Sequence, residues 1–146
     1  FADCSILTSF LLSEEGEVYA SGENGKRQIT GNKLENPASF YTKYTHIPFE
    51  IPILKLSVHT HVSGFVDIEG GVYLHGYNIT DSDSQILNIP PMKDIVVRPG
   101  NIYLLDEEGN VWVSGNNDYG QLGLGHKRRV KNFTMISDLP PIVQIA

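Results

Sequence analysis

The sequence is poor in cysteine and contains no long apolar run. Cys4 is the single cysteine among 146 residues, so the chain can form neither an internal disulfide nor a metal site built from several thiolates. No apolar run reaches the ~18 residues that a membrane helix requires, and no basic-then-apolar leader is present. We therefore expect an intracellular protein, cytoplasmic or nuclear rather than secreted, with no membrane span.

Cationic residues are also scarce. Lys and Arg number 11 against 17 Asp and Glu, which gives a net charge of −6. A surface of this charge disfavours nucleic acid and anionic lipid as partners, although a local basic patch remains compatible with it. Hydrophobic residues make up 40% of the chain, enough for a packed core, and 14 glycines and 8 prolines separate short apolar runs. This pattern is typical of a turn-rich β protein in one domain, residues 1–146.

One pattern occurs three times, as "SEEGEVYASG", "DIEGGVYLHG" and "DEEGNVWVSG". Around an anchor glycine, each copy has glutamate one residue before, valine two after, an aromatic three after, glycine six after and asparagine eight after. Two short β-prone runs that flank Glu-Gly predict a hairpin whose glycine has positive φ. The second glycine ends the second strand, where a side chain would impede a close backbone approach. The anchors are Gly16, Gly70 and Gly109, the aromatics Tyr19, Tyr73 and Trp112, the second glycines Gly22, Gly76 and Gly115, and the asparagines Asn24, Asn78 and Asn117.

Further apolar segments lie between these hairpins, at 52–58, 94–97 and 141–146, and we expect each to be a strand. A period of ~40–50 residues with about four strands per unit indicates the blades of a β-propeller. We expect units at about 2–55, 56–94 and 95–144, with the three aromatics in the core between blades. The asparagines are predicted to be turn residues whose amides bond to nearby backbone.

The stretch "DEEGNVWVSGNNDYGQLGLG" (106–125) resembles the repeat of the regulator of chromosome condensation family. That repeat reads acidic-Gly-x-Val-aromatic-x-x-Gly-x-Asn-x-x-Gly-Gln-Leu-Gly, and the third unit matches it through Gly120 and Gly123. The first unit has Arg27 and Thr30 where these glycines are expected, and the second departs after Asn78. The resemblance implies an all-β, seven-bladed propeller of four-stranded antiparallel blades, of which this chain holds about three. It also implies a small, buried packing role for Cys4.

The glycine-rich stretch 115–125 is not predicted to bind phosphate. A nucleotide site needs a helix N-terminus aimed at the phosphate, and nothing after this stretch indicates a helix. We interpret Gly115, Gly120 and Gly123 as turns between strands. No catalytic, cofactor or metal site is predicted: "HTH" (59–61) could place two imidazoles on one face of a strand, and "DSDS" (81–84) lacks the spacing of a calcium loop.

A basic cluster, "HKRR" (126–129), follows the third hairpin. Lys127, Arg128 and Arg129 could bind an acidic partner, a phosphate or a nucleic-acid backbone, or they could belong to an ordinary solvated loop. The acidic pairs Glu14-Glu15 and Glu107-Glu108 are expected at exposed hairpin turns, where general acid–base chemistry is not favoured.

These observations predict a non-enzymatic protein–protein interaction module, one part of a larger propeller scaffold in a multidomain or multisubunit protein. The alternative, which the resemblance implies for some family members, is guanine-nucleotide exchange on a small GTPase. Chromatin or histone binding is a third hypothesis, because an acidic face can meet basic histones. Three blades leave two sheet faces open, so we expect the remaining blades, in this chain or another subunit, to be partners.

Overall fold

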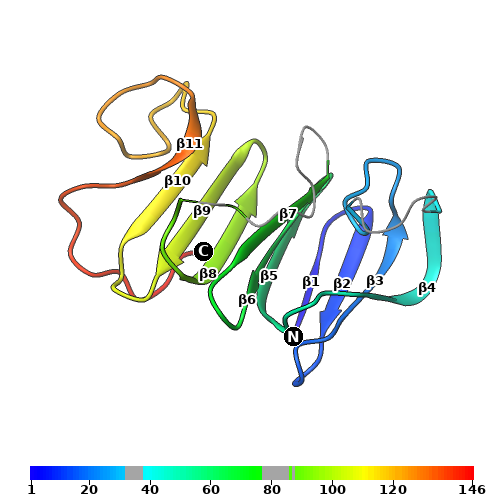
Figure 1. Ribbon diagram of the computed structural model, residues 1–146. Helices are drawn as coiled ribbons and strands as arrows, with labels where there is room; N and C mark the ends of the chain where they lie inside the picture. Colours follow the sequence, from blue (N-terminus) through cyan, green and yellow to red (C-terminus); the bar gives the residue numbers. More distant parts are fainter. Residues whose placement is uncertain (32–37, 77–85, 87) are drawn as a thin grey trace.

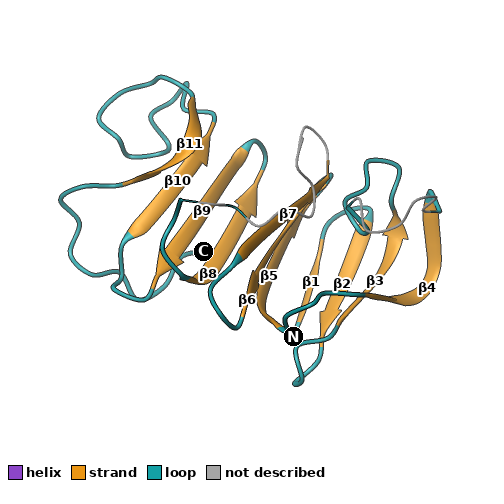
Figure 2. Ribbon diagram, viewed as in Figure 1, coloured by secondary structure: helices purple, strands orange, loops and turns teal. Residues whose placement is uncertain are grey.

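The computed structural model describes residues 1–31, 38–76, 86 and 88–146. Its strands form three antiparallel sheets that stand side by side (Figures 1 and 2). In spatial order, the first sheet contains β1 (Ala2–Cys4), β2 (Thr8–Leu12), β3 (Val18–Glu23) and β4 (Phe40–Ile47). The second contains β5 (Ile53–His59), β6 (Val62–Asp67) and β7 (Val72–Gly76), and the third contains β8 (Met92–Arg98), β9 (Asn101–Asp106), β10 (Val111–Gly115) and β11 (Val130–Met135). The described residues include no helix long and apolar enough to cross a membrane.

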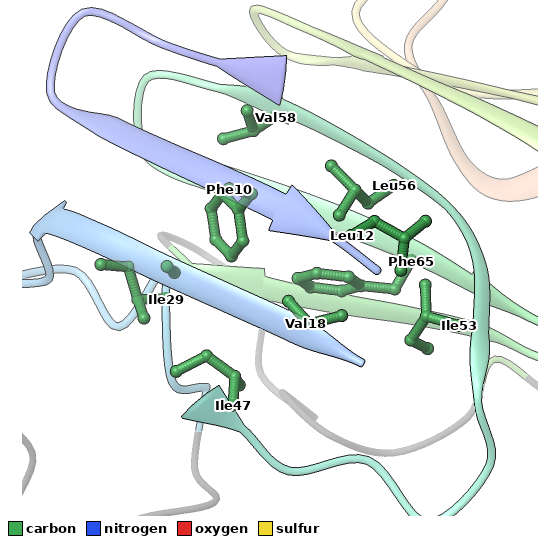
Figure 3. Close-up of a cluster of buried hydrophobic side chains, with 10 residues drawn as sticks. Phe10, Leu12, Val18, Ile29, Ile47, Ile53, Leu56, Val58 and Phe65 are labelled. Atoms are coloured by element: carbon green, nitrogen blue, oxygen red, sulfur yellow. The ribbon is translucent and has the colours of Figure 1, made fainter. Parts of the chain in front are cut away.

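Apolar side chains fill the space between neighbouring sheets. Alternate residues of β2 and β3 point toward the second sheet because side chains along a strand alternate between its two faces. Phe10 and Phe65 meet edge to face in this layer, with ring centroids 5.7 Å apart (Figure 3). A second layer joins the second and third sheets, and a third covers the far face of the third sheet. The middle sheet therefore packs on both of its faces.

The anchor and second glycines all have positive φ. Gly16, Gly70 and Gly109 lie in the hairpin turns at +82°, +85° and +88°. The second glycines approach a neighbouring backbone so closely that a methyl group would not fit. A Cβ on Gly115 would stand 2.1 Å from the carbonyl oxygen of Gly100, and one on Gly76 would stand 1.9 Å from that of His61. These positions therefore require glycine for steric as well as conformational reasons.

The strands that open the second and third sheets are tied to the preceding hairpin by one recurring hydrogen bond. The Ile53 N–H donates to the Gly16 carbonyl at 2.9 Å, and the Met92 N–H donates to the Gly70 carbonyl at 2.9 Å. The Ile142 N–H donates to Gly109 at 2.9 Å in the same way, although residues 141–146, predicted as a strand, form none here. The structure describes no further strand for this segment to pair with, and a β-ladder needs a neighbour on which to form.

A second recurrence, which the sequence analysis did not use, is isoleucine five residues before a proline. Ile47 pairs with Val18, while the Ile86 and Ile136 N–H groups donate to the carbonyls of Val72 and Val111 at 2.8 Å and 2.9 Å. Each isoleucine side chain joins one of the three apolar layers. The prolines, Pro52, Pro91 and Pro141, precede the residues that bond to the anchor glycines.

Four expectations need correction or fall outside the described residues. The aromatics of β3, β7 and β10 are half-buried, while their neighbours Val18, Val72 and Val111 are buried. These aromatics point to the opposite face, where Tyr73 packs in the layer between the first and second sheets and Trp112 in the layer between the second and third, whereas no described sheet stands against Tyr19. Cys4 is a free and exposed thiol, because the described chain places no sheet against the outer face of β1.

The second and third sheets begin at Ile53 and Met92, three residues before the predicted unit boundaries. Asn78 and residues 81–84 lie outside the described part of the chain.

Candidate functional site

The sheets present two rims, because equivalent turns lie at the same end of each sheet. The turns β2–β3, β6–β7 and β9–β10 form one rim, which we call the hairpin rim. The turns β1–β2, β5–β6 and β8–β9, with the long connections that leave β3, β7 and β10, lie at the opposite end (Figure 1). We call this second end the loop rim. Since the sheet faces are largely occupied by packing, the rims are where side chains are accessible to partners.

The hairpin rim is acidic. Six glutamates are exposed at the three hairpin turns: Glu14, Glu15, Glu17, Glu69, Glu107 and Glu108. None of them forms an ion pair with a described residue. The Lys93 ammonium group donates a hydrogen bond to the Glu107 carbonyl at 3.3 Å and leaves the glutamate carboxylates of the rim without an ion pair among the described residues. This rim therefore presents repeated negative charge to solvent.

Buried aspartates stabilise two of these turns by accepting hydrogen bonds from backbone N–H groups. Asp67 Oδ1 accepts hydrogen bonds from the Glu69 and Gly71 N–H groups at 2.9 Å and 2.8 Å. Asp106 accepts from the Asn110 N–H at 2.8 Å and from the Trp112 indole N–H at 3.0 Å. The sequence analysis missed both residues, although the signal is present: each stands three residues before its anchor glycine. Ser13 occupies the same place in the first hairpin and caps it with its hydroxyl.

These contacts shift two pKa values in opposite senses. Burial by itself would raise the pKa of Asp106, but the hydrogen bonds from Trp112, Asn110 and the backbone outweigh it and hold the pKa below its usual value. Burial, together with the nearby Asp67 carboxylate, raises the pKa of Tyr73 to about 12. Both groups therefore keep their neutral-pH charge states, and their role is to shape the turns.

A shallow pocket of about 290 Å³ opens on the hairpin rim of the first sheet. The residues that line it include Glu15, Glu17, Glu50 and Phe49. The Tyr19 hydroxyl donates to Glu17 at 2.9 Å, and this hydrogen bond raises the pKa of the tyrosine. The pocket adds to the negative character of the rim.

Buried asparagines organise the loop rim. In the connection after β3, Asn24 Oδ1 accepts from the Ile29 and Thr30 N–H groups at 2.9 Å and 3.2 Å. After β10, Asn117 Oδ1 accepts from the Leu122 N–H at 3.0 Å, and its amide donates to the His126 carbonyl at 2.7 Å. Ile29 and Leu122 are both buried beneath their loops. Each asparagine thus substitutes for the hydrogen bonds of a regular turn.

The glycines of the third loop and the basic cluster lie on this rim. Gly120 and Gly123 have φ of +77° and +70°. Arg27 stands where the first loop would have the equivalent of Gly120, and it adopts φ of +58°. Beyond them, Lys127, Arg128 and Arg129 are exposed, and none forms an ion pair within the described part of the chain.

The "HTH" segment forms the tight turn between β5 and β6, not one face of a strand. His59 Nδ1 bonds with the Thr60 hydroxyl at 2.8 Å, while His61 Nδ1 lies 3.9 Å from the carboxylate of Glu23, at the end of β3 in the first sheet. Thr60 has φ of +40°, which reverses the chain and separates the two imidazoles. Among the described residues, no group of three or more His, Cys, Asp or Glu is arranged to hold a metal ion.

Comparison with known proteins identifies the repeat by a family model and the fold by solved structures. Residues 108–146 match the family model of the regulator of chromosome condensation (RCC1) repeat. F-box only protein 24 of Homo sapiens is 26% identical over 139 residues, a match that covers 80% of this chain and 23% of the relative. The protein of the same description from Macaca fascicularis matches equally. The chain thus spans less than a quarter of the length of these curated relatives.

Solved structures share the arrangement of the three sheets. Human WBSCR16 superimposes with a TM-score of 0.78 at 18% identity, covering 94% of this chain and 37% of that chain. Prp20p of Saccharomyces cerevisiae, described with its binding properties to Gsp1p and histones, gives 0.78 at 15% identity, covering 94% and 38%. Yeast RCC1 (Prp20) with bound Kap60 gives 0.76 at 15% identity, covering 94% and 37%. The all-β, propeller-type fold predicted from the repeat is confirmed, and residues 108–146 carry an RCC1 repeat.

Proposed function

We propose that this chain is a protein-interaction module, one part of a larger propeller scaffold, without catalytic chemistry of its own. The observation that carries the proposal is the separation of charge between the two rims of the stacked sheets. Glutamates repeat along the hairpin rim, and the loop rim carries Lys127, Arg128 and Arg129, which form no ion pair with any residue that the structure describes. Charged patches of this kind steer association with partners of opposite charge and set partner choice. Prp20p, which has the same fold, is described as binding Gsp1p and histones, and this likeness supports protein partners.

The free thiol of Cys4 fits the same proposal. It is exposed on the outer face of the first sheet, where an oxidising compartment would favour intermolecular disulfides. We therefore propose that the protein works in a reducing compartment, in the cytoplasm or the nucleus.

Cross-linking of the full-length protein to its partners, read by mass spectrometry, tests the proposal. Lys93 and Lys127 provide amines near opposite rims, and Lys43 on β4 provides a comparison site away from both. We expect intermolecular cross-links to concentrate at one of the two rims. An even distribution over Lys43, Lys93 and Lys127 would contradict an interaction surface on the rims.

The second candidate function is guanine-nucleotide exchange on a small GTPase. The likeness to Prp20p, described with Gsp1p, favours it, and exchange needs only face loops that stabilise a nucleotide-free GTPase. Release of labelled GDP from a panel of small GTPases separates the two candidates. An interaction module leaves the release rate unchanged, whereas an exchange factor accelerates it in proportion to its concentration.

Histone binding is the third candidate, and it would use the hairpin rim. Its exposed glutamates provide the negative charge that a basic histone surface requires. Binding of purified core histones that is lost when Glu107 and Glu108 are both changed to glutamine would favour it over the other two.

A further inference from the structure

One row of paired residues crosses the third sheet at the loop rim, from β8 to β11. Arg98 pairs with Asn101, Asn101 with Gly115, and Gly115 with Val130. Arg129 directly precedes Val130, so cationic residues stand at both ends of this row. Neighbouring strands lie about 4.8 Å apart, and three such steps separate β8 from β11 by about 14 Å.

We infer that this row, which we call the cationic row, binds an acidic polypeptide segment in extended conformation. The segment runs across the strand ends from β8 to β11, and its carboxylates meet Arg98 at one end and Arg128 and Arg129 at the other. An extended chain rises about 3.4 Å per residue, so a span of about 14 Å corresponds to acidic residues four positions apart. Residues at that spacing point to the same side of a strand, as this arrangement requires. The inference rests on the proposed function and names the partner class of its loop rim.

The cations of the row are available for such a partner. Arg98 is exposed, and its guanidinium donates to the Val97 carbonyl at 3.0 Å, a contact that leaves it without an ion-pair partner among the described residues. Lys127, Arg128 and Arg129 are exposed as well, and no ion pair with them is found among the described residues. The first loop differs, because the Glu23 carboxylate lies within it and accepts from Gly25 and Gln28. The equivalents of Arg98 in the first two sheets are Ser5 and His59, which carry no fixed positive charge.

The loop that carries the cluster is held in place before any partner arrives. Asn117 is fully buried, and its amide donates to the His126 carbonyl at 2.7 Å. His126 Nδ1 in turn accepts from the Arg128 N–H at 3.1 Å, which fixes the backbone turn on which the arginines stand. A partner therefore orders only side chains, and binding loses less entropy than it would on a mobile loop.

The charge distribution favours a polypeptide over a nucleic acid. A nucleic acid carries a charge at every nucleotide, whereas the connection between β10 and β11 also holds the exposed Asp118 and the chain has a net charge of −6. An acidic segment needs carboxylates only at the two ends of the row. Tyr119, which is 90% exposed, stands beside Asp118 and supplies the kind of aromatic surface that is enriched at protein interfaces.

Fluorescence anisotropy with full-length protein tests the inference. The probe is a labelled peptide with two Asp-Glu pairs whose glutamates are four residues apart in a Ser/Gly background. An isomer with the four acids contiguous tests the spacing, and a labelled single-stranded oligonucleotide of equal length tests the nucleic-acid alternative. We expect the spaced peptide to bind most tightly, and its affinity to fall as salt rises through the physiological range.

Charge reversal locates the site. Arg128→Glu combined with Arg129→Glu should lower the affinity for the spaced peptide at least about tenfold, and Arg98→Glu should do so several-fold. The control pair, Lys43→Glu with Lys55→Glu, makes the same charge change at exposed positions on β4 and β5 and should leave the affinity within about twofold. Unchanged thermal melting of each variant shows that folding is intact.

Three results overturn the inference: equal losses in the Arg128/Arg129 pair and the control pair, tighter binding of the oligonucleotide, or equal binding of the two peptide isomers. None of these results affects the proposal of an interaction module. That proposal fails only if cross-links are spread evenly over the surface, so the two failures are distinguishable.

Discussion

Asp3 Oδ2 accepts a hydrogen bond from the Val58 N–H at 2.9 Å. This contact joins β1 of the first sheet to β5 of the second sheet. An equivalent hydrogen bond joins β5 of the second sheet to β8 of the third, where Ser57 Oγ accepts from the Val97 N–H at 3.0 Å. In both cases a side chain from an inner strand satisfies a backbone donor of the next inner strand. The sheets are therefore joined by specific polar contacts as well as by apolar packing.

Removal of the Asp3 carboxylate should destabilise the packing of the first sheet against the second. Asp3→Ala leaves the N–H of Val58, a buried residue, without its acceptor, which costs about 1–3 kcal/mol of unfolding free energy. Asp94→Ala is the matched control, because within the described part of the chain the Asp94 carboxylate accepts only from the N–H of its neighbour Ile95. Urea denaturation of both variants measures the difference. Equal losses would show that the contact between the sheets adds nothing.

A methyl group at Gly115 should be far more damaging than one at Gly120. Both glycines have positive φ, at +126° and +77°, so alanine is strained at each by about 1–2 kcal/mol. At Gly115 the new Cβ would also lie 2.1 Å from the Gly100 carbonyl oxygen, whereas nothing lies within 4 Å of it at Gly120. We expect Gly120→Ala to cost about 1–2 kcal/mol and Gly115→Ala to cost about twice that or more.

Thermal melting of the two glycine variants measures both costs. The φ of +58° at Arg27, in the place equivalent to Gly120, shows that a side chain is tolerated there in the first unit. If the two variants melted at the same temperature, the steric argument at Gly115 would be wrong.

Stability should decrease in acid through Asp106. Its pKa is lowered in the folded protein, so the carboxylate contributes stability that is fully present above the unfolded pKa of about 3.9. That contribution is lost as the pH falls through the lower folded value, because the unfolded chain binds the proton more readily. Trp112→Phe removes the indole donor, so the pKa should rise toward its ordinary value and the loss below about pH 4 should become smaller.

The measurement is the free energy of unfolding between neutral pH and about pH 3 for both proteins. Trp112→Phe also loses packing at every pH, so the slope with pH, rather than the absolute stability, tests the hydrogen bond. Parallel curves would exclude a role for the indole in holding the Asp106 carboxylate ionised.

Phe65 and Leu11 occupy the same place in successive sheets, and their substitutions should differ in cost. Phe65 pairs with Tyr73, and Leu11 pairs with Tyr19. Phe65 is fully buried against Phe10 and Phe49, so Phe65→Ala should cost about 3–5 kcal/mol. Leu11 is 37% exposed on the open face of the first sheet, so Leu11→Ala should cost less than about 1 kcal/mol if no further sheet covers that face.

The same pair tests whether further blades complete the fold. We propose that residues 1–146 alone melt without cooperativity or self-associate, because the outer face of the first sheet has no described cover. In the full-length protein, Leu11→Ala should then cost as much as a buried substitution. A sharp, cooperative melt of the isolated segment as a monomer would contradict the proposal.

The fold class was predictable from the sequence because its signals are local. A hairpin is specified by the glycine at its turn and by the apolar residues that flank it, and both recur at fixed offsets around Gly16, Gly70 and Gly109. The Asn-x-x-Gly-Gln-Leu-Gly segment likewise specifies its own loop, because Asn117 bonds to residues within that loop. Contacts over such short spans depend little on the rest of the molecule.

The tertiary structure alone decided which side of each strand is buried. The pattern Val-aromatic-x is the same in β3, β7 and β10, yet Tyr19 bonds to Glu17 near an open face while Tyr73 and Trp112 pack against a neighbouring sheet. Cys4 was expected to be buried and is exposed for the same reason. The ends of the cationic row, Arg98 and Val130, are 32 residues apart in sequence, and only the register of four strands brings them to one edge. Burial and proximity of this kind depend on which sheets stand next to one another, and short-range sequence patterns carry no information about that.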